Sequence, residues 1–143
     1  MKYLHPEAEE AVWLAQLAQY TTDFKKNLAE KGRLPAAFCR FYLEKGMHDH
    51  DLLSIEIRRR HTWKEKQFDV CMHWKSDAQV YTLTFQAVSR LEINFSPFGT
   101  LPDFIAGEFL ARDEKTLSCE MRLFSDFRLY LEHRRLQYRL LWR

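Results

Sequence analysis

The chain has little of what marks most enzymes and secreted domains. Its four glycines are isolated at positions 32, 46, 99 and 107, so no glycine-rich loop can cradle a phosphate group. The three cysteines (Cys39, Cys71 and Cys119) are odd in number and widely spaced, which favours reduced thiols over a disulfide framework. No Gly-x-Ser-x-Gly motif occurs, and no cysteine has a recognisable catalytic context. The sequence therefore shows no motif of an enzyme that uses a serine or cysteine nucleophile.

Long apolar runs and a large net charge are also absent. No apolar run approaches the roughly 18 residues of a membrane helix, and the first residues lack the apolar core of a signal peptide. We therefore expect a cytoplasmic protein with no membrane partner. The net charge of +2 makes nucleic acid an unlikely partner.

The charges are nevertheless segregated along the chain. Residues 52–75 and 116–143 each carry six Lys or Arg against three Asp or Glu, whereas residues 76–115 carry three against six. Such blocks are explained if strands of opposite charge pair with each other in a sheet. The alternative is a polar face on which a partner docks.

The 143 residues are 46% hydrophobic and 15% aromatic, enough for one domain with a ring-rich core. We expect a single domain spanning 1–143, with a helical part at 1–46 and a sheet part at 47–143. Between Pro6 and Gly32, apolar residues recur at helical spacing, which predicts a helix that packs on the sheet through Trp13, Leu17, Tyr20, Phe24 and Leu28. A second helix is expected at about 35–45, and the tight link between the two predicts a helical hairpin.

After Gly46 the apolar period changes from 3.6 to 2, which is typical of half-buried strands. Strands are expected at 53–58, 68–75, 81–95 (one long bent strand or two collinear ones), 105–112, 117–124, 127–133 and 136–142. The last three are too closely spaced for crossover helices and must be antiparallel. The predicted fold is α+β, with the helical hairpin packed on a mainly antiparallel sheet of about six to eight strands.

The densest cluster of titratable residues is His48, Asp49, His50 and Asp51. In extended backbone, histidines two residues apart point to one face, and their nitrogens suit zinc, iron or manganese. The run resembles the start of the His-x-His-x-Asp-His signature of metallo-β-lactamase-like hydrolases, but Leu52 stands where that signature has Asp. The alternative is structural, because Asp and His at a helix-to-strand junction hydrogen-bond loose backbone groups.

Two further groups of residues could bind or react. His61, His73 and Glu56 lie on or near the strands that follow the junction and could extend a site there. The basic run Arg58, Arg59 and Arg60 with Trp63 is the best candidate for nucleic-acid contact, with edge protection of a strand as the alternative.

The order of parts resembles a family of uncharacterised small bacterial proteins. The matching residues are Met1-Lys2-Tyr3, the run from His48 to Glu56, and the strand patterns Tyr81–Phe85 with Val88 and Leu91–Ile93. The resemblance implies a small α+β cytosolic protein and carries over only His48 and Asp49 as site residues. Toxin-immunity proteins are similar in layout.

The leading hypothesis is a non-enzymatic protein-binding module without a cofactor, with toxin immunity as its concrete form. Its basis is the lack of catalytic motifs together with the segregated charge, which suits electrostatic docking. A metal-dependent hydrolase centred on His48 and His50 is one alternative, and a weak nucleic-acid binder that uses Arg58–Arg60 is the other.

Overall fold

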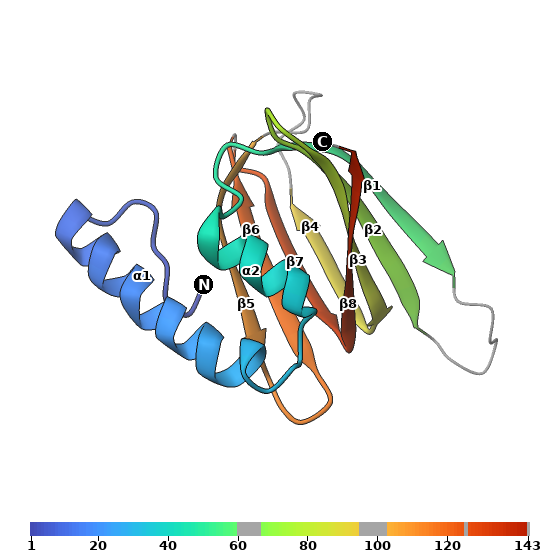
Figure 1. Cartoon of the computed structure of the whole chain (residues 1–143), viewed down its shortest axis with the longest axis horizontal. Helices are drawn as coiled ribbons and strands as arrows, with labels where there is room; N and C mark the ends of the chain where they lie inside the picture. Colours follow the sequence, from blue (N-terminus) through green and yellow to red (C-terminus); the bar gives the residue numbers. More distant parts are fainter. Residues whose placement is uncertain (60–66, 95–102, 125, 143) are drawn as a thin grey trace.

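A computed structural model describes residues 1–59, 67–94, 103–124 and 126–142 of the chain (Figure 1). The helices precede all the strands, so the two kinds of element are segregated along the chain, as is typical of an α+β fold. The helical elements are α1 (Glu10–Phe24), the π-helical turn η1 (Lys25–Ala29) and α2 (Ala36–Glu44). The strands are β1 (Asp51–Arg59), β2 (Phe68–Lys75), β3 (Val80–Val88), β4 (Arg90–Asn94), β5 (Phe104–Ala111), β6 (Leu117–Leu123), β7 (Arg128–His133) and β8 (Arg135–Trp142). In these ranges no helix combines the length and the apolarity needed to cross a membrane.

The strands form two antiparallel sheets, with the orders β1-β2-β3-β8 and β4-β7-β6-β5. The prediction of one sheet of six to eight strands is therefore wrong, although the predicted strand positions agree closely with the observed ones. The long strand expected at 81–95 is divided into β3 and β4 by Ser89, next to a bend at Ala87, where φ is +54°. Arg134 divides β7 from β8 in the same way. Each of these two chain segments passes from one sheet to the other.

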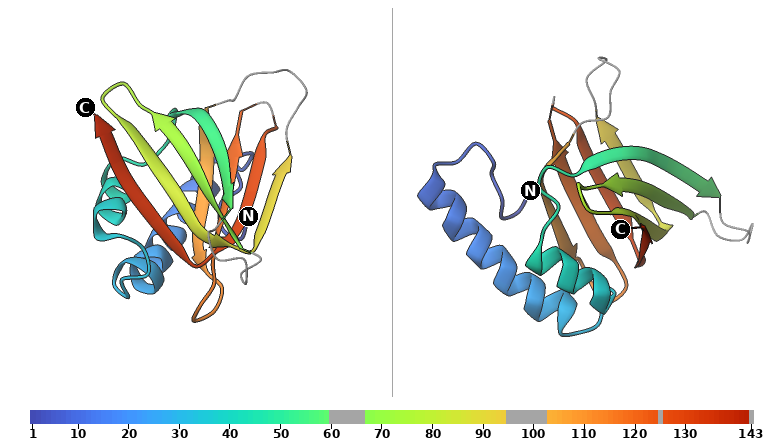
Figure 2. Two further views of the ribbon diagram at one scale, coloured as in Figure 1. Left: turned by 90° about the vertical axis from the view of Figure 1, so that its right-hand side faces the viewer. Right: turned by 45° about the horizontal axis from the view of Figure 1, so that its top comes forward.

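Both sheets curve around one side of the molecule, and α2 lies against their inner faces (Figures 1 and 2). The ring of Phe38 on α2 contacts Phe109 on β5 and Tyr138 on β8. Phe41, one turn later, contacts Tyr81 on β3. This helix thus joins the two sheets through an aromatic core, as the ring-rich composition predicts.

The structure does not show the predicted helical hairpin. The helices meet where the rings of Tyr20 and Phe24 contact Tyr42, and α1 and η1 otherwise approach β5. The apolar stripe of the first helix is buried only in its second half, because Leu17 remains 38% exposed. The expectation that this stripe packs on the protein's own core holds for Tyr20, Phe24 and Leu28 and in part for Trp13, whereas Leu17 remains exposed.

Strand β5 is an edge strand whose free side is covered by two tyrosines. The backbone N–H of Phe109 donates to the Tyr20 hydroxyl at 2.8 Å, and the Tyr42 hydroxyl donates to the Gly107 carbonyl at 2.9 Å. The two hydroxyls also lie 2.9 Å apart. Because unpaired edge groups invite pairing with other chains, these hydroxyls both satisfy and protect this edge.

The first residues of the chain are fixed to the outer face of the β5 sheet by one buried carboxylate. Glu108, only 1% exposed, accepts hydrogen bonds from the backbone N–H groups of Lys2 (2.8 Å), Tyr3 (2.7 Å) and Leu4 (2.5 Å). The amino group of Met1 lies 3.4 Å from the Glu120 carboxylate on the neighbouring strand. A buried charge is tolerated when it is fully hydrogen-bonded, and three N–H donors meet that condition.

Candidate functional site

The junction between helices and strands, residues 46–51, turns sharply rather than extending. Gly46 ends α2 with φ +69°, and Asp49 also has a left-handed backbone, with φ +63°. The His50 N–H donates to the Met47 carbonyl at 3.0 Å and closes a turn that contains Asp49. Asp is among the few residues other than Gly that adopt this conformation readily, which explains its place here.

The turn separates the two histidines of the cluster. His48 Nδ1 lies 3.1 Å from Asp49 Oδ2, and both side chains are about two-thirds exposed, at 67% and 69%. His50 Nδ1 instead hydrogen-bonds the Tyr81 hydroxyl at 2.7 Å, and its ring lies beside Phe41. The argument that the two rings share a face requires extended backbone, and Asp49 does not have it. Partial burial lowers the pKa of His50, so this ring is neutral at pH 7.

The backbone of the junction ties the two sheets together. The Asp49 N–H donates to the Phe104 carbonyl at 3.1 Å, and the Phe104 N–H donates to the His50 carbonyl at 3.0 Å. Asp51 and Asp103 then form an isolated antiparallel bridge. Their carboxyl groups hydrogen-bond each other, which raises the pKa of Asp103. Sequence analysis did not find Asp103, because it lies more than fifty residues from the cluster in a stretch expected to be irregular.

The structure does not assemble the cluster into a metal centre. Within the described ranges, no three His, Cys, Asp or Glu side chains are close enough together to hold a metal ion. His73 is on the outer face of its sheet, where its Nδ1 lies 3.0 Å from Ser54 Oγ. Glu56 pairs with Arg58 at 2.8 Å, which lowers the pKa of the carboxyl group. Of the residues proposed to extend the site, His73 and Glu56 therefore have partners elsewhere.

The basic candidate surface is only partly within the described residues. Arg58 is paired with Glu56, and Arg59 is exposed at the end of β1. Arg60, His61 and Trp63 lie outside the described residues. The described part of this surface thus consists of one exposed and one paired arginine at the end of an edge strand.

A groove of about 380 Å³ lies beside the junction. Its walls come from the inner side of α1, the end of α2 and the start of β5, and its lining is mainly apolar, with Trp13, Leu17, Leu43, Met47 and Ile105. His48 is at its margin. A groove of this size and polarity can accept a large apolar side chain or a small apolar molecule. Of the four residues His48, Asp49, His50 and Asp51, it is His48 that borders this groove.

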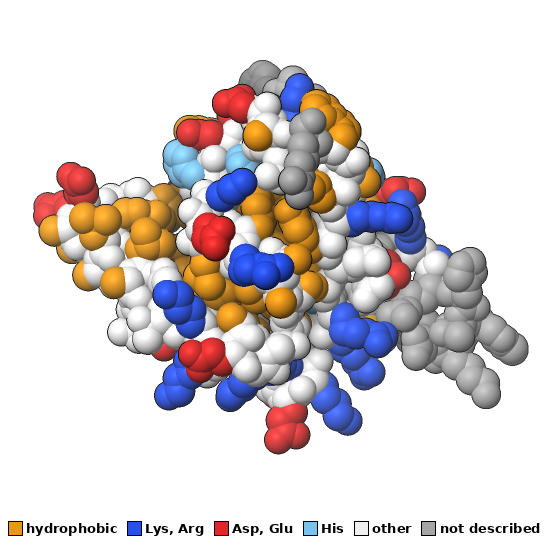
Figure 3. All heavy atoms as spheres, viewed as in Figure 1, with side chains coloured by type: hydrophobic (Ala, Val, Ile, Leu, Met, Phe, Trp, Pro, Cys, Tyr) orange, Lys and Arg blue, Asp and Glu red, His pale blue; other side chains and the backbone are white. Residues whose placement is uncertain are grey.

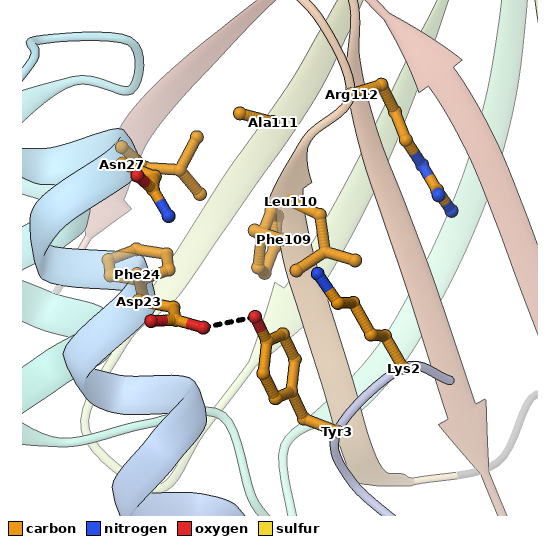
Figure 4. A pocket seen from close by; sticks show the side chains of 10 residues that line it. Lys2, Tyr3, Asp23, Phe24, Asn27, Phe109, Leu110, Ala111 and Arg112 are labelled. Carbon is orange, nitrogen blue, oxygen red and sulfur yellow. Dashed lines mark hydrogen bonds between the residues drawn. The ribbon is translucent and has the colours of Figure 1, made fainter.

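A smaller pocket of about 70 Å³ separates the N-terminal residues from α1 and β5 (Figure 4). The Tyr3 hydroxyl spans it and donates to Asp23 on α1. This bond to a carboxylate raises the pKa of Tyr3 to about 12 and lowers the pKa of Asp23. This contact fixes the second half of α1 to the start of the chain.

Comparisons with protein-family models, with curated proteins and with solved structures find no match to this chain. The resemblance to small bacterial proteins and to immunity proteins consequently stays a prediction.

Proposed function

We propose that the chain is a non-enzymatic protein-binding module, with neutralisation of a bacterial toxin as its concrete form. The observation that carries the proposal is the open edge of β8. In the described part of the chain, β8 pairs with β3 on one side and with no strand on the other. An open edge strand can bind an extended segment of another protein as an additional strand.

The side chains of β8 support this use. Residues 134–143 carry four arginines and no acidic residue. Arg135 and Arg139 are exposed on β8, and Leu141 and Trp142 at its end are 45% and 58% exposed. In Figure 3, Lys and Arg side chains are spread over this face of the molecule, including the part where β8 lies. Exposed Trp and Arg are the residue types that dominate binding energy at protein interfaces.

The charge of β8 determines the chemistry of the partner. Two copies of β8 placed side by side would bring arginines together, and like charges opposed across strands are destabilising. An extended acidic segment would instead pair its carboxylates with Arg135 and Arg139. We therefore expect a partner that presents an acidic strand.

A pull-down with the tagged chain from cells of the source organism tests the proposal. The wild type should retain one stoichiometric protein, and the double variant Arg135→Glu/Arg139→Glu should lose it. Arg59→Glu, an equal change on the exposed end of the opposite edge strand, should keep it. Recovery of no stoichiometric partner by the wild type would count against the proposal. For the toxin hypothesis, the captured protein should arrest growth when produced alone and not when produced with this chain.

The two alternatives are tested by separate measurements. A metal-dependent hydrolase requires bound metal, so elemental analysis of untagged protein that finds less than about 0.2 metal ions per chain removes a tight site. Nucleic-acid binding through the arginines requires affinity that falls steeply with salt, so a flat salt dependence removes that alternative.

A further inference from the structure

The first half of α1 extends beyond the body of the protein. Figures 1 and 2 show this half of the helix projecting away from both sheets. Of its fifteen residues only Tyr20 and Phe24 are buried, whereas Val12 is 48% and Leu14 is 55% exposed. Hydrophobic side chains cover this projecting end in Figure 3.

The composition of α1 is unusual for a helix so exposed to solvent. Residues 11–22 contain no charged side chain. A solvent-facing helix in a globular protein normally carries charged residues on its outer face. Large exposed apolar patches on soluble proteins mark interaction surfaces. The projecting half of α1 therefore has the properties of a surface that another molecule covers.

One line of residues along α1 and the first residue of η1 joins apolar side chains to charges at both ends. These residues follow at steps of four, three, four and four, so they lie on one side of the helix: Glu10, Leu14, Leu17, Thr21 and Lys25. We refer to them as the α1 stripe. Glu10, Leu14, Leu17 and Lys25 are exposed, and Leu17 and Thr21 also line the groove beside the helix. The stripe is acidic at its start and basic at its end.

Because its two ends carry opposite charges, the α1 stripe of one copy is complementary to the α1 stripe of a second, antiparallel copy. If two copies of α1 are placed antiparallel with the two-fold axis between Leu17 and Ala18, Glu10 of each copy lies opposite Lys25 of the other. Leu14 lies opposite Thr21 in the same register. Antiparallel helices also place the positive end of each helix dipole beside the negative end of its neighbour. A parallel pair would oppose like charges at both ends.

We propose that two copies of the chain pair through their α1 stripes, antiparallel and about a two-fold axis, each closing the groove of the other. A contact in which the same surface is used by both copies is the commonest form of homodimer. The helix is about 22 Å long, so the contact is small and falls below about 1,200 Å² in total. Interfaces of that size dissociate readily, so the dimer forms at high protein concentration and is lost on dilution.

Sedimentation velocity between about 5 and about 500 µM, a range in which small interfaces dissociate, tests the pairing. The wild type should shift from monomer to dimer, and Leu14→Glu should stay monomeric throughout. Leu53→Glu makes the same change at a leucine of similar exposure on β1, 49% against 55%, and should dimerise as the wild type does. A wild type that stays monomeric overturns the proposal. So does a Leu14→Glu variant that still dimerises, or an equal loss in both variants.

Charge reversal tests the antiparallel register. Glu10→Lys and Lys25→Glu should each weaken the dimer about threefold or more at low salt, because each opposes like charges at two symmetric positions. The double variant restores opposite charges and should return the dissociation constant to near the wild-type value. Failure of the double variant to recover overturns the register. Circular dichroism melts of every variant should match the wild type, since all these positions are exposed.

Discussion

Replacement of Glu108 by Gln should remove much of the order at the start of the chain. The carboxylate accepts three backbone N–H groups, with Lys2 on Oε2 and both Tyr3 and Leu4 on Oε1. Glutamine keeps one oxygen for Tyr3 and Leu4 but turns an NH₂ group toward the Lys2 N–H, so one charged hydrogen bond is lost. Because a hydrogen bond to a charged group contributes about 1.5–3 kcal/mol, we expect the free energy of unfolding to fall by about 2 kcal/mol.

Urea denaturation at pH 7 measures this loss, and amide hydrogen exchange at residues 2–4 locates it. Glu120→Gln is the matched control, because Glu120 lies on the adjacent strand, is 36% exposed and pairs with the Met1 amino group at 3.4 Å. Because Glu120 is partly exposed and the two groups are 3.4 Å apart, this pair should contribute less than about 1 kcal/mol. If Glu108→Gln changed the unfolding free energy by less than about 0.5 kcal/mol, or left residues 2–4 as protected as in the wild type, the account of this buried carboxylate would be wrong.

Three further predictions concern the junction, the β5 edge and a buried histidine. Asp49→Ala should lower the unfolding free energy by about 1 kcal/mol, whereas Asp49→Gly should not lower it. The reason is that position 49 requires a left-handed backbone, which glycine adopts freely, and not the exposed carboxylate. Equal losses for the two variants in thermal melts would contradict this. Tyr20→Phe should cost about 1 kcal/mol in urea denaturation by leaving the Phe109 N–H without its acceptor, and a neutral effect would show that water replaces the hydroxyl. Burial lowers the pKa of His133 to about 4, so its stabilising neutral form is fully present above pH 6.5 and is lost as pH falls toward 4. The unfolding free energy of the wild type should therefore drop between these values by up to about 3 kcal/mol more than that of His133→Asn, and parallel pH profiles would refute the assignment.

The strands were predictable from sequence because alternation is a local signal. Residues 68–75 alternate strictly, and the structure has β2 at those positions. The division of the long strand into two sheets was not predictable, because it depends on the backbone of Ala87, and alanine rarely adopts a positive φ. The start of α1 was placed too early, since Pro6 and the acidic residues after it are typical of a helix start, yet the Ala8 N–H donates to the His5 carbonyl in a separate turn.

The candidate site was less predictable, because its contacts join residues far apart in the chain. The sequence identifies His48 and His50 as a cluster, but the partner of His50 is Tyr81, which lies thirty-one residues later at the start of the strand expected at 81–95. Asp51 meets Asp103, and Glu108 meets the first residues of the chain. Nothing in the spacing of a single sequence reports such contacts, since only the closing of the sheets brings these groups together.

The two chain segments that pass from one sheet to the other affect how the protein unfolds. The residues that link the sheets continue the pairing across the bend: the Ser89 N–H donates to the Glu132 carbonyl at 2.9 Å, and the Arg134 N–H donates to the Gln86 carbonyl at 3.0 Å. Neither sheet can separate from the other without breaking bonds of both. Unfolding should therefore occur as one transition, with amides of β2 and β6 exchanging at the same slow rate although they belong to different sheets. A force applied to the open edge of β8 would be distributed to β7, and through it to the whole molecule.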